Sequence, residues 1–140
     1  MTELTGQCLC GAVKFTADVN KDKTSVCHCG MCRRWAGGPY FALDCSGAVT
    51  FEGEKNISTF RSSDWGERGF CKICGSTLFW RTHDQSFLGM AVGLFDDQSQ
   101  FELTNQIFID DKPDWYEFAN KTNNMTGAEV MAMFTDQATD

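Results

Sequence analysis

Two short cysteine pairs decide the fold: Cys8-Leu9-Cys10-Gly11 near the start of the chain and Cys71-Lys72-Ile73-Cys74-Gly75 in its middle. Each pair sets two sulfurs on one tight turn, and the glycine after it suits the left-handed conformation that lets backbone N–H groups face a sulfur. Tetrahedral zinc is usually bound by two such pairs from separate places in a chain. Closing so long a loop should contribute strongly to folding. The predicted ligands of this structural zinc are Cys8, Cys10, Cys71 and Cys74.

A third cluster, Cys27-His28-Cys29-Gly30-Met31-Cys32, offers three more sulfurs. Three protein ligands and one vacant position are typical of a reactive zinc. Cys45 is an alternative fourth ligand that would close this site, or a buried thiol after the apolar run 40–43. His28 is less suited, because it lies between two ligands and should point the other way. The sequence thus predicts two Zn²⁺ per chain, the second on Cys27, Cys29 and Cys32.

Disulfides are a competing use for eight cysteines, but they belong mainly to secreted chains. The segment 1–6 has neither the basic start nor the apolar stretch of a signal peptide. The most apolar run, 87–95, is too short to span a bilayer and contains glycines. We therefore expect a cytoplasmic protein with reduced cysteines and no membrane partner.

The formal net charge of −7 argues against nucleic acid as a partner, because a negative field repels phosphate backbones. The basic residues are scattered, apart from Arg33-Arg34. An apolar fraction of 42% is ordinary for a globular protein, and an aromatic fraction of 13% favours a packed, β-rich body.

The hydrophobic pattern predicts many short strands and few helices. Residues 13–19 alternate between apolar and polar, which is typical of a half-buried strand, and 20–23 should form a turn. A short strand leads into Cys27, and a helical turn over 29–36 should end at the glycines 37–38. Further strands are predicted at 40–44, 49–52, 57–61, 69–71, 78–81, 87–92 and 107–109.

These elements predict a mainly β fold of antiparallel sheets pinned by zinc, with few short helices. We find no internal boundary and expect a single zinc-binding domain over 1–120. Residues 121–140 should form a C-terminal tail or a short helix, with its helix-forming residues at 128–134.

The three cysteine motifs, with Ala12-Val13 after the first, Arg33-Arg34 after the second and Phe70 before the third, resemble one family. This is the glutathione-dependent formaldehyde-activating enzyme family, which includes the centromere protein V relatives. The resemblance covers residues 6–115 and implies an Mss4-like fold, with a structural and a labile zinc on the same ligands as above. This chain departs from the family at Gln106, where members often carry a histidine.

The resemblance also implies an activity: condensation of formaldehyde with glutathione to S-hydroxymethylglutathione, formally a carbon–sulfur lyase reaction. A thiol at the vacant zinc position would lose its proton and become a nucleophile for an aldehyde carbon. Glutathione is anionic, so Arg33 and Arg34 are the candidate carboxylate ligands, or else a solvated pair. Trp35 is a candidate wall of the pocket, or else a core residue.

Two other functions fit the same residues. Thiols add to formaldehyde readily without help, so the site could serve as a non-catalytic glutathione carrier. Alternatively, both zincs could be closed in a structural module for a protein partner. The sequence leaves the physiological thiol and aldehyde and the oligomeric state open.

Overall fold

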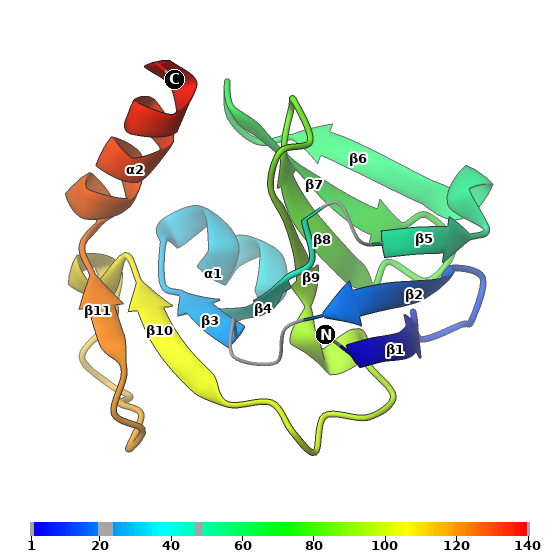
Figure 1. The fold of residues 1–140 in the computed structure, drawn as a ribbon, viewed down its shortest axis with the longest axis horizontal. Helices are drawn as coiled ribbons and strands as arrows, with labels where there is room; N and C mark the ends of the chain where they lie inside the picture. Colours follow the sequence, from blue (N-terminus) through cyan, green and yellow to red (C-terminus); the bar gives the residue numbers. More distant parts are fainter. Residues whose placement is uncertain (1, 20–23, 47–48, 140) are drawn as a thin grey trace.

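The computed structural model describes residues 2–19, 24–46 and 49–139, and it consists of two β-sheets, two α-helices and three short 3-10 helices. The turn predicted at 20–23 lies outside the described residues. Figure 1 shows the smaller sheet beside strands β6–β9 and the C-terminal helix α2 at the opposite end. The prediction of a mainly β fold with few short helices is confirmed.

The smaller sheet has three antiparallel strands in the order β1-β2-β5. The alternation at 13–19 gives β2, in which Phe15, Ala17 and Val19 are buried while Lys14 and Asp18 are exposed. β1 was not among the predicted strands. It pairs with β2 along its whole length, so its partner rather than its own apolar content holds it. The bounds are β1 (Thr2–Gln7), β2 (Lys14–Val19) and β5 (Val49–Glu52).

The larger sheet has eight strands in the order β11-β10-β3-β4-β9-β8-β7-β6. Most neighbouring strands within this sheet are antiparallel, as predicted. The strand predicted at 40–44 is β4. Its members are β3 (Thr24–Cys27), β4 (Tyr40–Asp44), β6 (Ile57–Arg61), β7 (Gly66–Cys71), β8 (Thr77–Thr82), β9 (Leu88–Ala91), β10 (Leu103–Ile107) and β11 (Asn123–Met125).

Strand β10 makes the sheet mixed, because it runs parallel to both β3 and β11. Parallel neighbours need a long connection, and the chain supplies one on each side of β10. Figure 1 shows the segment after β9 running along the lower edge of the molecule before it enters β10. The strand predicted at 107–109 is wrong beyond Ile107, because Phe108 takes a left-handed φ of 53° and the 3-10 helix η4 (Ile109–Asp111) follows.

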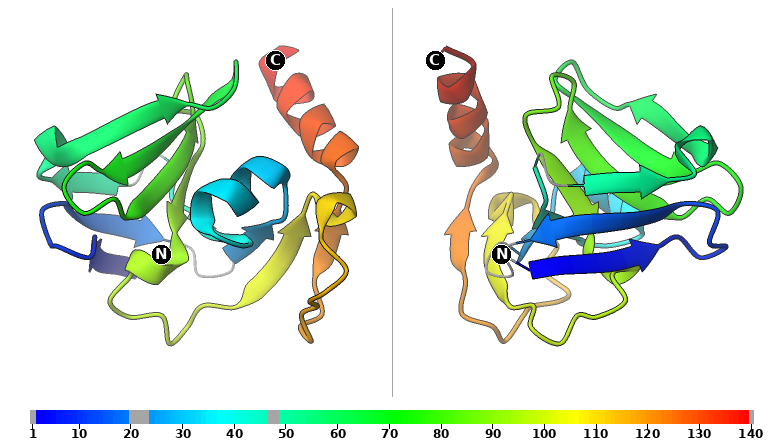
Figure 2. Two further views of the ribbon diagram at one scale, coloured as in Figure 1. Left: turned by 180° about the vertical axis from the view of Figure 1, so that it is seen from behind. Right: turned by 45° about the vertical axis from the view of Figure 1, so that its right-hand side comes forward.

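The helical turn predicted after Cys29 is α1 (Gly30–Ala36), and it ends at Gly37 as predicted. In Figure 2, left, α1 lies in the middle of the molecule, between strands β6–β9 and β10. The C-terminal helix α2 spans Gly127–Thr139. A capping box starts it, since Thr126 and Glu129 exchange side-chain to backbone hydrogen bonds of 3.0 and 3.2 Å. Among the described residues, no helix is long and apolar enough to cross a membrane.

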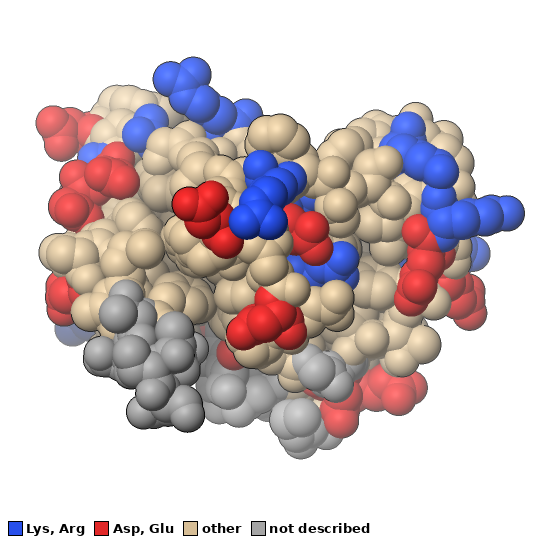
Figure 3. All heavy atoms as spheres, turned by 90° about the horizontal axis from the view of Figure 1, so that it is seen from above, with Lys and Arg blue, Asp and Glu red and all other residues tan. Residues whose placement is uncertain are grey.

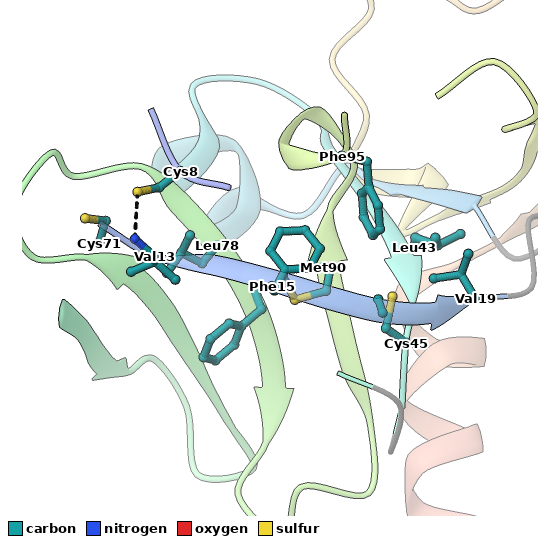
Figure 4. Close-up of a cluster of buried hydrophobic side chains, with 12 residues drawn as sticks. Cys8, Val13, Phe15, Val19, Leu43, Cys45, Cys71, Leu78, Met90 and Phe95 are labelled. Atoms are coloured by element: carbon teal, nitrogen blue, oxygen red, sulfur yellow. Dashed lines mark hydrogen bonds between the residues drawn. The ribbon is translucent and has the colours of Figure 1, made fainter. Parts of the chain in front are cut away.

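Two 3-10 helices, η2 (Glu54–Asn56) and η3 (Val92–Leu94), complete the elements. The core lies between the two sheets, where Figure 4 shows side chains of β2 gathered with those of β4, β8 and β9. Its largest fully buried side chain is Phe79 on β8, which also contacts Phe51 on β5 at 5.7 Å between ring centroids. The fold thus depends on burial between the sheets. On the face in Figure 3, Lys and Arg are interspersed with Asp and Glu at the surface.

Phe79→Ala tests the core. Phe79 is fully buried, so its truncation should lower the free energy of unfolding by about 3–5 kcal/mol. The matched control is Phe60→Ala on β6, because Phe60 is 64% exposed and its loss should cost less than about 1 kcal/mol. Urea titration of both variants measures the difference, and equal losses would contradict this position of the core.

Candidate metal centres

The first centre is a tetrad of sulfurs that joins the end of β1 to the turn between β7 and β8. All four sulfur atoms lie within 4.8 Å of one another. The sulfur of Cys10 lies 3.7 Å from that of Cys8 and 3.8 Å from that of Cys71. Tetrahedral zinc with Zn–S bonds of about 2.3 Å would place its sulfurs about 3.8 Å apart. The predicted ligands Cys8, Cys10, Cys71 and Cys74 therefore form a group that fits a tetrahedral metal ion.

The glycines of the two knuckles have the predicted conformation. Gly11 and Gly75 take φ angles of 82° and 79°, in the left-handed region. Backbone N–H groups then face the sulfurs, with Val13 N 3.4 Å from Cys8 Sγ and Cys74 N 3.5 Å from Cys71 Sγ. These hydrogen bonds favour the thiolate form that a metal ion requires.

Ser76 links the two knuckles, a role that the sequence did not assign to it. Its hydroxyl accepts a hydrogen bond from Leu9 N at 3.0 Å and lies 3.1 Å from Cys74 Sγ. The hydrogen bond from Ser76 is the main cause that lowers the pKa of Cys74 to about 5. A serine two residues after a knuckle cysteine is common in polar turns, so its type alone gives no signal.

The second centre is a trio of buried sulfurs around the start of α1. Cys27 ends β3, Cys29 caps α1 and Cys32 lies in its first turn. The three are 8%, 8% and 5% exposed, and their sulfurs lie within 4.8 Å of one another. Cys29 Sγ accepts a hydrogen bond of 3.3 Å from Cys32 N. The predicted trio is therefore assembled in space.

The thiols of the metal-free trio differ in pKa, so they hold their protons unequally. Hydrogen bonds from Cys27 and Cys32 hold the pKa of Cys29 at about 2. The same bond to Cys29 raises the pKa of Cys27 well above its ordinary range. Three thiolates cannot coexist in a buried site without a cation, because like charges repel strongly there. The donor set therefore favours a thiophilic cation such as zinc.

The two alternative ligands lie elsewhere. Cys45 belongs to the core between the sheets, and burial raises the pKa of its thiol to about 12. The ring of His28 turns away from the sulfurs, as predicted, with its nitrogens 2.7 Å from Tyr116 Oη and 2.8 Å from Gln106 Oε1. Burial lowers the pKa of His28. Within the described part of the chain, the trio has no fourth Cys, His, Asp or Glu ligand.

Arg68 on β7 is a site residue that sequence reasoning missed. Its side chain is 4% exposed, and Nη1 donates a 3.4 Å hydrogen bond to Cys32 Sγ. Three thiolates with one divalent ion would carry a single net negative charge, which this guanidinium would neutralise. A buried charge is costly unless it is paired. Nothing in the sequence around Arg68 distinguishes it from an arginine on the exposed face of a strand.

The predicted substrate residues occupy three different environments. Arg34 is exposed to solvent, whereas Arg33 is half-buried and its Nε donates a 2.9 Å hydrogen bond to His28 O. Trp35 packs on Tyr40 and stacks under Arg68, whose Cζ lies 4.8 Å from the centroid of the indole. Trp35 therefore supports the buried cation beside the trio.

A cavity of about 120 Å³ adjoins the trio. The three cysteines and Arg68 contribute to its surface, but most of the remaining wall is apolar. The larger side chains in that wall are Trp65, Trp80, Phe87, Ile107, Phe108 and Phe134. A small molecule in this space would lie next to the sulfurs.

Single cysteine variants should separate the two centres. Cys74→Ser breaks the tetrad that joins distant segments, so we expect a fall in Tm of about 10 °C or more. Cys27→Ser should release one zinc per chain and leave the fold intact, with a change in Tm of a few degrees. Metal analysis and calorimetry of both variants check this, and comparable melting losses would contradict the assignment.

Arg68→Met should weaken metal binding at the trio by roughly 10–100-fold, the usual effect of losing a partner of a metal ligand. Arg68→Lys retains the charge and should lose less metal affinity than Arg68→Met. The control is Arg61→Met, because Arg61 is exposed on β6. Competition with a chromophoric chelator measures the affinity; an unchanged value in Arg68→Met would show that the guanidinium does not stabilise the thiolates.

Two known proteins are similar to this chain over most of its length. An uncharacterised lyase of Schizosaccharomyces pombe is 39% identical over 94% of this chain and 96% of its own length. A Halomonas elongata protein, whose name assigns it to the glutathione-dependent formaldehyde-activating enzymes, is 28% identical over 84% of this chain and 82% of its own.

A crystal structure from Rhodobacter sphaeroides has the same fold, with a TM-score of 0.59 and 20% identity. It matches 66% of this chain and 88% of its own. The family model described as glutathione-dependent formaldehyde-activating enzyme matches residues 3–111, which include all seven clustered cysteines. The chain therefore belongs to the glutathione-dependent formaldehyde-activating enzyme family.

Proposed function

We propose that the protein binds two zinc ions and, at the trio, joins a thiol such as glutathione to an aldehyde. The reaction would be of the S-hydroxymethylglutathione synthase type, a carbon–sulfur lyase activity. The observation that carries the proposal is a group of three buried sulfurs beside a cavity. Membership of the family supports glutathione and formaldehyde as the reactants.

The two clusters would have different roles. The tetrad offers four sulfurs, a complete set for tetrahedral zinc, so its ion would be structural. The trio offers three, which leaves one position for an external ligand. Zinc at the trio would lower the pKa of a thiol at that position and so supply a thiolate at neutral pH.

The chain's own residues would hold and neutralise this site. Cys27, Cys29 and Cys32 bind the ion, and the guanidinium of Arg68 keeps the buried charge balanced. The charged ends of glutathione must stay near solvent, because burying them unpaired is costly. Arg34 is exposed and lies on the same helix as Cys32, so it is the candidate carboxylate ligand, together with Arg33.

The reaction forms one carbon–sulfur bond. The thiolate attacks the carbonyl carbon of the aldehyde, and the π electrons of the C=O bond move to oxygen. The proton that the thiol gave up returns from solvent to this alkoxide, so the product is a hemithioacetal and nothing is oxidised or reduced. Exclusion of water by the apolar cavity would favour addition of the thiol over hydration of the aldehyde.

NMR exchange spectroscopy on a mixture of formaldehyde and glutathione tests the proposal, because it measures the rate of adduct formation at equilibrium. The zinc-loaded protein should increase the rate of adduct formation in proportion to its concentration. Cys32→Ser should abolish the increase because it removes a ligand from the trio. The matched control is Cys45→Ala, since Cys45 lies outside both clusters and should retain the increase.

The alternatives predict other results. Glutathione binding without any increase in rate would overturn the enzymatic proposal and identify a carrier. Two firmly held zincs and no glutathione binding would identify a structural module. Calorimetric titration of the same zinc-loaded preparation with glutathione distinguishes the two, because a carrier binds glutathione and a structural module does not.

A further inference from the structure

The cavity beside the trio has an aromatic wall whose members contact one another. Trp65 and Trp80 lie 5.2 Å apart between ring centroids, and Phe134 lies 5.2 Å from Trp65. Phe87 continues the wall, 5.6 Å from Trp80 and 6.2 Å from Phe134. These rings form one continuous apolar surface, and it ends at the sulfur trio.

The C-terminal helix α2 completes this wall. Its Val130 is 5% exposed and lines the cavity with Phe134. The ring of Phe134 lies 6.0 Å from that of Trp80 on β8 as well as against Trp65, so side chains join the helix to the strands. The enclosure is therefore built from segments distant in sequence.

The polarity of the cavity restricts what can enter it. Among the lining residues that the structure describes, Arg68 is the one charged side chain apart from the cysteines. Its Nη1 already donates to Cys32 Sγ, and its buried Nε has no hydrogen-bond partner among the described residues. The hydroxyl of Tyr40 donates to Gly89 O at 2.7 Å and is not free for a ligand. Beyond this one guanidinium the cavity offers few polar partners, so a ligand with several charged groups would lose its hydration there with little compensation. The tripeptide body of glutathione is therefore expected to lie outside the cavity.

The size of the cavity points the same way. Its volume of about 120 Å³ is close to that of an engineered apolar cavity of roughly 150 Å³ that binds benzene. Formaldehyde has a single carbon and would leave most of this volume empty. A phenyl ring or a branched alkyl chain would fill it and contact the aromatic wall.

From these observations we propose that the carbonyl substrate is an apolar aldehyde with an aryl or branched alkyl body. The inference rests on the proposed function and names the substrate class of the same site. The apolar body lies against Trp65, Phe87 and Phe134, and this places the carbonyl carbon beside the trio. The thiolate sulfur bonds to that carbon, the carbonyl oxygen takes the electron pair and then a proton, and a hemithioacetal results.

Benzaldehyde is the probe, with formaldehyde as the comparison and glutathione as the thiol. The zinc-loaded full-length protein should accelerate benzaldehyde adduct formation with a lower KM than for formaldehyde. Phe134→Ala should reduce the ratio of kcat/KM for benzaldehyde to that for formaldehyde about tenfold, because it removes a ring from the wall. Phe60→Ala, outside the cavity, should leave the ratio unchanged.

Tryptophan fluorescence without thiol gives an independent readout. Benzaldehyde should quench Trp65 and Trp80, and Phe134→Ala should weaken this binding by a similar factor. Acceleration with formaldehyde but neither binding nor acceleration with benzaldehyde would overturn the substrate class alone. Binding of benzaldehyde with no acceleration for either aldehyde would overturn the proposed function and the substrate assignment with it.

Discussion

Four sulfur atoms on two turns lie where a single metal ion would join the two sheets of this protein. One turn follows β1 of the small sheet, and the other joins β7 to β8 of the large sheet. The core between the sheets contains Phe79 and other side chains with no exposed surface, but 140 residues bury only a modest core. A metal ion that binds only the folded chain adds its binding free energy to that of the core. The rest of the structure, including the trio, is built on this frame.

The trio has the opposite character, because its three ligands come from one short segment. It closes no long loop, so a metal ion bound there would contribute less to the fold and would be available for chemistry. Its charge is balanced from β7 by Arg68, which itself rests on Trp35. The short helix α1, in the middle of the molecule in Figure 2, thus carries a candidate metal ligand beside a buried cation and an apolar cavity.

Local patterns in the sequence predict a large part of this structure. The strands at 40–44, 49–52 and 57–61 agree with the structure to the residue, because turn-forming residues bound each of them. The grouping of the cysteines also follows from their spacing, because a tetrahedral ion needs four ligands and one turn supplies only two. Phe108 marks the limit: its apolar neighbours indicate a strand, and only the backbone turn at this residue ends it.

Features that depend on distant contacts could not be predicted. β1 and β11 exist because β2 and β10 pair with them, and β10 is parallel because of the connections around it. Arg68 and the aromatic wall come together only in three dimensions.

The central claim is that the sulfurs are shared unequally, with four for one zinc and three for the other. X-ray absorption at the zinc edge, before and after addition of glutathione, tests this claim most directly. Unequal sharing predicts an average between three and four sulfurs per zinc that rises to four with glutathione; four sulfurs per zinc without added thiol would contradict it.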